Sequence, residues 1–500
     1  MANERDLRFP GADKPDPKPD SWIRQNPSSL PPKPAHLTGN PFPSAREIGE
    51  FLAGRLLRAE EIPFSIDFIR KYEERGWVTR RKGIRKEKNR PVCERCGNRN
   101  PFFFAAYPCA RCQTDCLYCR NCLMMGRISE CTELFCWIGP EPMVRYADPL
   151  RWQGILSPAQ KEASEAIVSC IEQGGELLIW AVCGAGKTEM LFSGIGRALE
   201  LGKRVCIATP RTDVVLELEP RVRQAFPEVS VSALYGGSEE RDRYSSLVVS
   251  TTHQLFRFYR AFDVMIVDEV DAFPYSVDET LKRAVTRAKK PEGSIIFLTA
   301  TPEEKWQEEC RRRIRPCVIL PARFHRKPLP IPDFVWCGNW KKRLEKGKIP
   351  EPVARWIRQR LEVGKQAFLF FPAIGVMENA LPLFQKMDPR IEAVHSEDPE
   401  RKEKVMAMRE GKIPILLTTT ILERGVTIPN LDVAVLGAEE EVFSESALVQ
   451  IAGRVGRHPR YPKGNITFFH YGKTRAMVRA RNQLLRMNRD ARELGMIDGE

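Results

Sequence analysis

The first segment with chemical potential is a glycine-rich loop, Ala181-Val182-Cys183-Gly184-Ala185-Gly186-Lys187-Thr188. It follows a short apolar run and precedes an amphipathic stretch, which is the setting of a phosphate-binding loop. Glycines let backbone N–H groups turn toward phosphate oxygens, the lysine places a positive charge there, and the threonine hydroxyl can coordinate Mg²⁺. We therefore predict an ATP site contacted by Gly184, Ala185, Gly186, Lys187 and Thr188.

Three further residues complete the predicted ATP site. Asp268 and Glu269 come directly after a second apolar run, residues 264–267. At the end of a buried strand, the aspartate can hold the Mg²⁺ shell and the glutamate can polarise the attacking water. Upstream of the first strand, Gln160 carries an amide that both donates and accepts, as reading the adenine edge requires.

Cysteines are concentrated in one stretch, with nine of the 15 lying between Cys93 and Cys136. Disulfides are rare in the cytosol, and clustered C-x2-C pairs indicate a metal. Two such pairs about twenty residues apart suit one structural Zn²⁺ with four ligands. Cys93 and Cys96 form the first pair. Two alternatives remain for Cys109, Cys112 and Cys116, which either contribute to a second zinc site or replace a ligand of the first.

The elements that position the ATP site form two series of short, strongly apolar runs. Such runs indicate strands buried on both faces, and their alternation with amphipathic stretches predicts parallel sheets covered by helices. We therefore predict an α/β fold with two similar tandem lobes, at residues 150–320 and 346–500, joined by a proline-rich linker at 321–345. The runs are residues 177–182, 205–208, 247–250, 264–267 and 295–298, then 367–371, 393–395, 413–418, 432–436 and 466–469.

The segment before the lobes is predicted to have three parts. Residues 1–45 are rich in proline and are expected to be a disordered tail. Residues 46–90 have helical apolar spacing and end in a basic run that starts at Arg80, and residues 91–137 form the cysteine-rich zinc module. The basic run is either a solvent-exposed surface or a DNA-binding surface. The zinc module together with this run could equally bind a protein partner.

The net charge is +14 and the pI is near 9.1, which suits a polyanion such as nucleic acid or an anionic membrane surface. The first residues lack the apolar stretch of a secretory signal, and no apolar run approaches the roughly 18 residues that span a bilayer. We therefore expect a cytoplasmic protein that is either cytosolic or peripheral at the inner face of the cell membrane through protein contacts.

The ordered set of motifs over about residues 150–475 resembles superfamily 2 helicases and translocases, which implies that the two tandem lobes are RecA-like. In that family, the segments that match residues 209–211 and 250–254 touch the nucleic acid, which implies contacts from Thr209, Arg211, Thr251 and Thr252. The segments at 418–427 and 450–457 resemble motifs of the second lobe. They imply a nucleic-acid contact from Thr419, a nucleotide contact from Gly425, and two arginine fingers, Arg454 and Arg457, facing the phosphates across the cleft.

Residues 180–191, 268–276, 323–330, 334–340 and 418–427 narrow the resemblance to the ComFA family of late-competence ATPases from transformable Gram-positive bacteria. The family pattern at residues 118–126 also implies that Cys119 and Cys122 join Cys93 and Cys96 as zinc ligands. The resemblance implies a motor that drives transforming single-stranded DNA into the cytoplasm. Its implied partners are a membrane DNA-uptake channel, a phosphoribosyltransferase-like competence protein and a DNA-processing protein.

Two other functions fit the same motifs. One is a helicase that unwinds duplex or forked DNA in repair or replication restart, because the same lobes serve both activities. The other is a nucleotide-gated scaffold of the uptake machinery, which predicts ATP binding with slow hydrolysis. A full set of catalytic residues argues against the scaffold. An oligomeric assembly is compatible with each.

Overall fold

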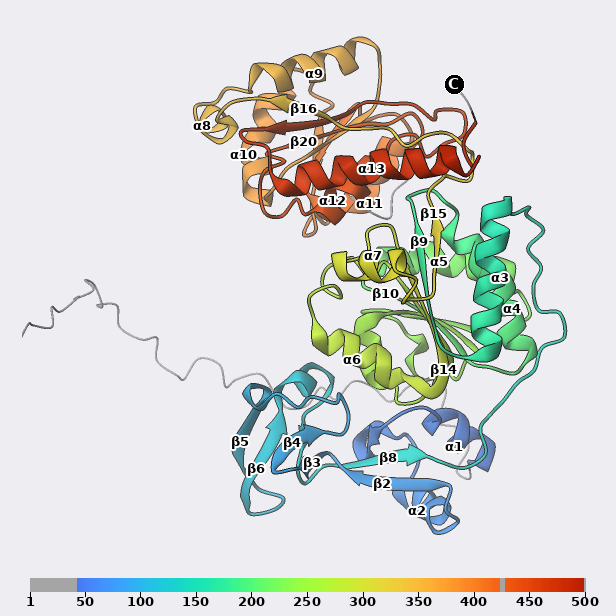
Figure 1. The fold of residues 1–500 in the computed structure, drawn as a ribbon. Coiled ribbons are helices and arrows are strands. Elements are labelled where there is room, and N and C mark those ends of the chain that lie inside the picture. Colours follow the sequence, from blue (N-terminus) through green and yellow to red (C-terminus); the bar gives the residue numbers. More distant parts are fainter. Residues whose placement is uncertain (1–42, 423–427, 499–500) are drawn as a thin grey trace, which may run out of the picture.

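The computed structural model describes residues 43–422 and 428–498. Two α/β lobes lie one above the other, and an N-terminal part packs on the far side of the first lobe (Figure 1). Nearly all of the expected proline-rich tail, as far as residue 42, lies outside the described residues. The described chain opens with Ser44, whose side chain caps helix α1 (Ala45–Leu52) in a capping box with Glu47.

The first lobe is a seven-stranded parallel sheet with helices on its faces. The strand order is β11-β12-β10-β13-β14-β9-β15. The strands are β9 (Glu176–Ala181), β10 (Val205–Thr209), β11 (Val231–Leu234), β12 (Leu247–Thr251), β13 (Phe262–Asp268), β14 (Lys289–Thr299) and β15 (Cys317–Leu320). The helices are α3 (Pro158–Gln173), α4 (Lys187–Glu200), α5 (Thr212–Ala225), α6 (Glu279–Ala288) and α7 (Glu304–Arg311).

The second lobe is a six-stranded parallel sheet of order β16-β21-β20-β17-β19-β18. Its strands are β16 (Asp333–Trp336), β17 (Ala367–Phe370), β18 (Glu392–Val394), β19 (Ile415–Thr418), β20 (Asp432–Leu436) and β21 (Ile466–His470). Its helices are α8 (Trp340–Glu345), α9 (Glu351–Glu362), α10 (Ile374–Gln385), α11 (Arg401–Arg409), α12 (Glu445–Ala452) and α13 (Arg475–Glu493). Because β16 pairs with β21, this lobe begins inside the segment expected to be a linker at 321–345.

The connection between the lobes, residues 321–332, is fastened to the second lobe. The Asn488 side chain in α13 accepts a hydrogen bond from the Leu329 N–H at 2.7 Å and donates one to the Leu329 carbonyl at 2.8 Å. Arg326 pairs with Asp498 at 2.9 Å. Residues 326–329 of the connection are therefore held to the second lobe, while the Phe324 N–H donates to the Gly184 carbonyl of the first lobe at 3.1 Å, so the connection is not a free tether.

The N-terminal part is a single interleaved unit, and the boundary expected at residues 90/91 does not divide it. Strand β8, at the end of the cysteine-rich segment, pairs with β1 and β2 from the helical and basic region. The segment that carries the two groups of cysteines is an insertion between β2 and β8. The elements are α1, β1 (Leu57–Arg58), α2 (Ile66–Glu74), β2 (Val78–Lys82), β3 (Ile84–Glu87), β4 (Arg90–Cys93), β5 (Phe104–Cys109), β6 (Thr114–Cys119), β7 (Ile128–Ser129) and β8 (Glu133–Trp137).

Two buried arginines attach the N-terminal part to the first lobe. Arg55 donates to the Arg241 carbonyl at 2.9 Å and lies over the Phe258 ring. Arg204 of the lobe donates to the Ser245 carbonyl and, at 3.4 Å, to the Ala53 carbonyl. Since both guanidinium groups are almost fully buried, the contact is a packed interface and not a tether.

Candidate active site between the two lobes

The phosphate loop connects β9 to α4 and has the backbone that its glycines allow. Gly184 and Gly186 have φ values of +84° and +76°, where an L side chain would be strained. Gly186 is the N-cap of α4, so the helix N-terminus and its first N–H groups face the loop. A Cβ at Gly186 would also lie 2.3 Å from Nε2 of Gln160. Glycine is therefore required there for its conformation, and a side chain would in addition displace the Gln160 amide.

A cavity of about 470 Å³ adjoins the phosphate loop and is lined by residues of both lobes. Most of the predicted nucleotide and catalytic residues line it: Gln160, Gly184, Gly186, Lys187, Thr188, Asp268, Glu269, Arg454 and Arg457. Ala185 lies buried beneath the loop, and Gly425 is outside the described residues. Sequence reasoning missed Trp152 and Phe324, which add aromatic surface to this cavity.

The two carboxylates stand at the carboxyl end of β13. Asp268 is the last residue of the strand, and its Oδ1 accepts a hydrogen bond of 2.8 Å from the Glu269 N–H. Glu269 has φ +57°, which is unusual for a residue with a side chain and typical of functional sites. The turn thus presents two successive carboxylates to the same cavity as Lys187 and Thr188.

Arg454 and Arg457 reach the cavity from the turn that follows α12 in the second lobe. Arg457 donates to the Gly453 carbonyl at 3.0 Å, which holds its side chain along the turn. Arg454 is 2% exposed. Burial, followed by the nearby charge of Arg457, lowers the pKa of its guanidinium well below the usual range. A phosphate anion between the lobes would relieve this cost, so the arrangement suits a nucleotide.

Arg323 is a functional candidate that the motif analysis did not identify. It lies in the connection between the lobes, is 2% exposed, and packs beneath Gly184 of the phosphate loop. Its guanidinium donates to the carbonyls of Val455 at 2.7 Å and Gly453 at 3.4 Å, and also to that of Gly456. Burial lowers its pKa to about 10. Arg323 therefore stabilises the turn after α12 that carries Arg454 and Arg457.

Gln160 lines the cavity, but its amide is occupied by the chain itself. Its Oε1 accepts from the Ser157 N–H at 2.8 Å in a capping box, and its Nε2 donates to the Ala185 carbonyl at 2.9 Å. Reading adenine would require at least one of these bonds to be replaced or shared. In this structure Gln160 supports the phosphate loop, and the adenine contact stays a prediction.

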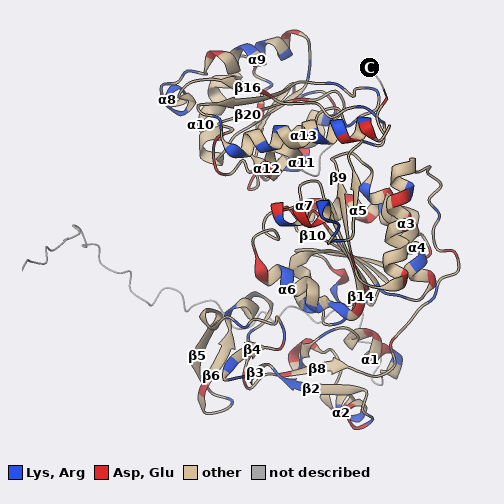
Figure 2. Ribbon diagram, in the orientation of Figure 1, with Lys and Arg blue, Asp and Glu red and all other residues tan. Residues whose placement is uncertain are grey.

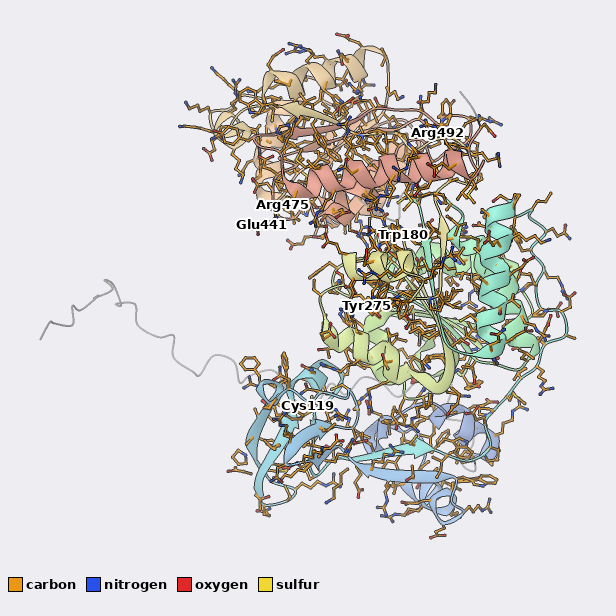
Figure 3. The ribbon with its side chains drawn as sticks, viewed as in Figure 1. Cys119, Trp180, Tyr275, Glu441, Arg475 and Arg492 are labelled. Atoms are coloured by element: carbon orange, nitrogen blue, oxygen red, sulfur yellow. The ribbon has the colours of Figure 1, made fainter. Side chains whose placement is uncertain are left out.

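A hydrogen-bond network joins the lobes beside the cavity. Asp271 accepts from Thr299 at 2.8 Å and Thr301 at 2.7 Å in the first lobe, and from Ser446 of α12 at 2.5 Å. The Ala300 carbonyl, between the two threonines, accepts from Trp180 at 3.1 Å and from Gln483 of α13 at 2.7 Å. Figure 3 shows Trp180 at the edge of the first lobe that faces α13. A change in the nucleotide site can thus reach the second lobe directly.

The residues expected to touch nucleic acid have unequal access to solvent. Thr209 and Thr252 are fully buried and Thr251 is 5% exposed, because they lie at or just after the ends of β10 and β12, whose faces are covered by helices. Their side chains therefore cannot contact a strand in this conformation, contrary to expectation. Arg211 is partly exposed and donates to the Ile421 carbonyl of the second lobe at 2.8 Å, and Thr419 is also partly exposed.

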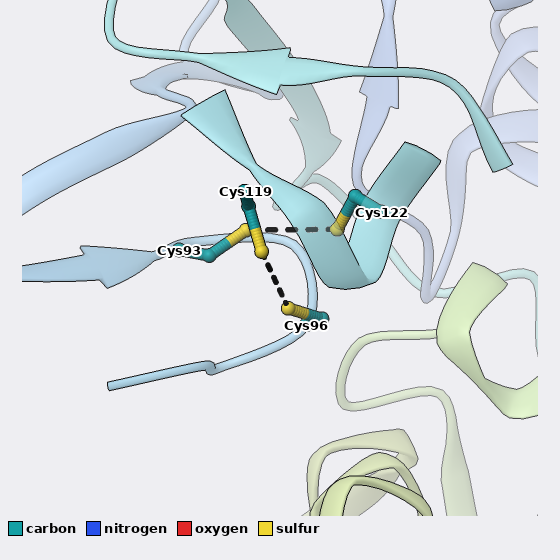
Figure 4. A group of neighbouring side chains, drawn as sticks. All are labelled: Cys93, Cys96, Cys119 and Cys122. Atoms are coloured by element: carbon teal, nitrogen blue, oxygen red, sulfur yellow. Dashed lines mark hydrogen bonds between the residues drawn. The ribbon is translucent and has the colours of Figure 1, made fainter. Parts of the chain in front are cut away.

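The four cysteines expected to bind zinc converge in the N-terminal part (Figure 4). All sulfur atoms of Cys93, Cys96, Cys119 and Cys122 lie within 4.8 Å of one another, with 3.7 Å between Cys93 and Cys122 and 3.5 Å between Cys96 and Cys119. Sulfurs at about 2.3 Å from a tetrahedral Zn²⁺ are about 3.8 Å apart, so the group fits the metal. Asn98 Nδ2, 3.9 Å from the Cys119 sulfur, adds a polar neighbour to it.

The basic run is only partly available to a partner. Arg80 pairs with Glu73 at 2.6 Å and with Glu133, while Arg81 stacks on Tyr259 of the first lobe. Lys82, Lys86 and Lys88 are exposed. Figure 2 shows basic and acidic residues interspersed along the ribbon of both lobes and the N-terminal part. Among the described helices, none combines the length and apolarity needed to span a bilayer.

Comparisons with known proteins match the three parts of the chain separately. Residues 42–136 match the family described as "Competence protein ComFA N-terminal domain". Residues 153–304 match "Type III restriction enzyme, res subunit", and residues 352–459 match "Helicase conserved C-terminal domain". The boundaries of the last two matches fall within the two lobes.

Two relatives match most of the chain. The chain is 48% identical to "Competence protein ComFA" of Bacillus subtilis over 91% of this chain and 98% of that protein. It is 37% identical to "Competence protein ComFA" of Streptococcus pneumoniae, over 84% and 95%. The structure of S. cerevisiae Dbp5 bound to RNA and ADP BeF3 aligns with 67% of this chain and 92% of that chain, at 12% identity and a TM-score of 0.48.

Proposed function

The chain belongs to the ComFA family of competence proteins, and we propose that it is an ATP-driven translocase on single-stranded DNA. It has the two RecA-like lobes of a superfamily 2 helicase-type ATPase. Its role would be to drive transforming DNA into the cytoplasm at the inner face of the membrane. The observation that carries the proposal is one cavity lined by Lys187 and Glu269 of the first lobe and by Arg454 and Arg457 of the second.

The chemistry follows from what each side chain can do. Loop N–H groups and Lys187 bind the β- and γ-phosphates, and Glu269 orients and polarises the attacking water. Thr188 and Asp268 would hold the Mg²⁺ ion, which neutralises phosphate charge. Arg454 and Arg457 stabilise the charge that develops on the γ-phosphoryl group. Where such arginine fingers are known they raise the rate by about 10³–10⁵.

Movement follows because the site is divided between the lobes. The arginines reach the phosphates only while the lobes are closed, and hydrolysis removes the γ-phosphate that holds them. Asp271 and its partners Thr301 and Ser446 are placed to relay this change. Alternating closure and opening would move Arg211 and Thr419, on opposite lobes, relative to one another along a bound strand.

The cellular setting of the proposal rests on family membership. It includes a membrane DNA-uptake channel, a phosphoribosyltransferase-like competence protein and a DNA-processing protein as partners. The uptake role is tested by transformation frequency in a natural host carrying Glu269→Gln, which is expected to fall to the level of a gene deletion.

ATP hydrolysis measured with single-stranded DNA, duplex DNA and RNA side by side tests the enzymatic part. We expect the largest stimulation by single-stranded DNA, and its loss in Lys187→Ala and Glu269→Gln. The controls Lys161→Ala and Glu279→Gln change charges exposed on α3 and α6 and should hydrolyse normally. Robust strand displacement on forked substrates would favour the helicase, and ATP binding with slow, DNA-independent turnover would favour the scaffold.

A further inference from the structure

A second group of four cysteines lies in the N-terminal part. The sulfur atoms of Cys109, Cys112, Cys116 and Cys131 all lie within 4.8 Å of one another, and those of Cys109 and Cys131 are 3.6 Å apart. This spacing matches the first group and the roughly 3.8 Å expected between thiolates on a tetrahedral Zn²⁺. We propose that Cys109, Cys112, Cys116 and Cys131 form a second zinc site, distinct from that of Cys93, Cys96, Cys119 and Cys122.

The backbone of the second site repeats the turn of the first. In the first C-x2-C pair, Gly97 has φ +71° and its N–H donates to the Cys93 carbonyl at 2.9 Å. In the second, Gln113 has φ +57° and its N–H donates to the Cys109 carbonyl at 2.8 Å. A glutamine in the left-handed region is unusual. The turn that brings Cys109 and Cys112 together as a ligand pair therefore includes one residue in an unfavourable backbone conformation.

The other two ligands are brought together by β6 and the turn after β7. Cys116 and Cys119 are three residues apart on β6, so their side chains leave opposite faces of the strand, one toward each site. The turn that carries Cys131 is pinned beside Cys116. Its Glu130 N–H donates to the Leu117 carbonyl and its carboxylate accepts from the Leu117 N–H, both at 3.0 Å.

The surroundings favour a metal over an apolar cluster of thiols. Cys93, Cys96, Cys119 and Cys122 pack among apolar side chains, whereas the second group borders a polar pocket of about 420 Å³. Three arginines and two glutamates line this pocket: Arg58, Arg111, Arg127, Glu60 and Glu133. A Zn²⁺ ion with four thiolates is an anion, which the excess of arginine over glutamate would partly balance. The Tyr107 hydroxyl lies 3.4 Å from the Cys109 sulfur, as a donor to a coordinated thiolate would.

The two sites interleave along the chain and brace one small module. Cys93, Cys96, Cys119 and Cys122 hold the β4 turn against the end of β6. The second group would hold the β5–β6 hairpin tip against the turn at Glu130. Cys112 is only half-buried while every ligand of the first site is buried, so the second metal should be lost first. A zinc ion there would stiffen a hairpin that has little apolar packing of its own.

Metal analysis of the full-length protein, purified under reducing conditions without chelator, tests the proposal. We expect two Zn²⁺ per chain by mass spectrometry of the elements, and one in the double variant Cys112→Ser, Cys131→Ser. Cys136→Ser is the matched control, because this buried cysteine lies in the same part of the fold and outside both groups, and should retain two. One Zn²⁺ per wild-type chain, or iron as the second metal, would overturn the proposal.

Two further measurements use the wild-type protein alone, so they do not depend on the variants folding. A mercurial reagent should release zinc from the wild type in a fast and a slow phase of one equivalent each. A single phase in the wild type would contradict two sites of different exposure. Peptide mapping after alkylation should find Cys109 and Cys131 reduced, since a disulfide between them would exclude both as zinc ligands.

Discussion

The Cys183 thiol in the phosphate loop donates a hydrogen bond of 3.0 Å to Oε1 of Gln450 in α12, across the boundary between the lobes. Gln450 lies in the last turn of α12, so the loop that would bind phosphate directly contacts the helix that leads into the turn with Arg454 and Arg457. The lobes are in close contact there, because a Cβ at Gly453 would lie 2.5 Å from the Cβ of Cys183. Cleft closure thus depends on a glycine.

Gly453→Ala should keep the lobes apart. Gly453 has φ −62°, which alanine adopts readily, so the effect would come from the clash with Cys183 and not from backbone strain. We expect kcat to fall by about tenfold or more, equivalent to about 1.4 kcal/mol, with ATP binding nearly unchanged. Gly375→Ala, at an open position in α10, is the control. Equal kcat values in the two variants would show that closure does not need this contact.

Arg323→Lys should separate positioning from binding. Lysine keeps the charge but cannot donate in several fixed directions at once, so the backbone at Gly453 and Val455 would lose its support. We expect kcat to fall by about 10–100-fold with KM for ATP changed only a few-fold, at about 1 kcal/mol for each hydrogen bond lost. Arg326→Lys, exposed in the same segment, should behave as wild type. A proportionate rise in KM would instead place Arg323 on the nucleotide.

His325 should make the cleft sensitive to acid. Its Nε2–H donates to the Gly456 carbonyl at 3.0 Å and its Nδ1 accepts from the Lys327 N–H at 3.3 Å, which is the neutral form. Burial lowers its pKa, so the unfolded chain takes up the proton first as pH falls. The stabilisation is complete above about pH 6.5 and is lost below it. His470, whose pKa is also lowered by burial, acts in the same direction.

Thermal unfolding of His325→Gln and wild type, compared between pH 7.5 and 5.5, isolates the contribution of His325. Glutamine can still donate to Gly456 but does not titrate. The midpoint temperature of the variant should fall less steeply with acid than that of wild type. Parallel curves would mean that His325 is accommodated equally well when charged.

Asp271→Asn should uncouple the lobes more than Ser446→Ala does. The Asp271 carboxylate accepts from both lobes, whereas Ser446 supplies only the cross-lobe part. Hydrogen bonds to a charged group are worth about 1.5–3 kcal/mol, so we expect stimulation by DNA to fall more than tenfold in the first variant and less in the second. Thr286→Ala, on the exposed side of α6, is the control. Equal losses in both variants would assign the whole effect to the cross-lobe bond.

Charge reversal of Lys82, Lys86 and Lys88 should show whether the N-terminal part contacts DNA. These lysines are exposed, whereas Arg80 and Arg81 are engaged within the fold. If each neutralises one phosphate, the slope of log affinity against log salt for single-stranded DNA should shrink by about 2. Reversal of Lys346, Lys348 and Lys386, exposed on the second lobe, serves as the charge-matched control. An unchanged slope would leave the basic run as a solvated face.

The sequence alone was sufficient to predict the structural position of residues whose position depends on their neighbours in the chain. Lys187 and Asp268 each follow an apolar run, and parallel strands bring their carboxyl ends to one edge of the sheet. The first-lobe side of the ATP site was therefore predictable from the linear sequence. The two-lobed α/β fold and the family resemblance are confirmed. The strands β11, β15 and β16 were missed, since each is short and lies at or next to a sheet edge where a long apolar run is not needed.

The tertiary structure decided which distant residues meet. Nine clustered cysteines allowed several pairings, and only the opposite faces of β6 assign Cys116 and Cys119 to different groups. Arg323 lies in a segment, residues 323–330, that carried only the family resemblance, and its supporting role comes from the carbonyls of the turn after α12. The burial of Thr209 and Thr252 likewise depends on helices packed over the strand ends. The local sequence pattern indicates which chemistry a side chain can perform. Its solvent exposure and its contact partners depend on packing between segments that are far apart in the chain.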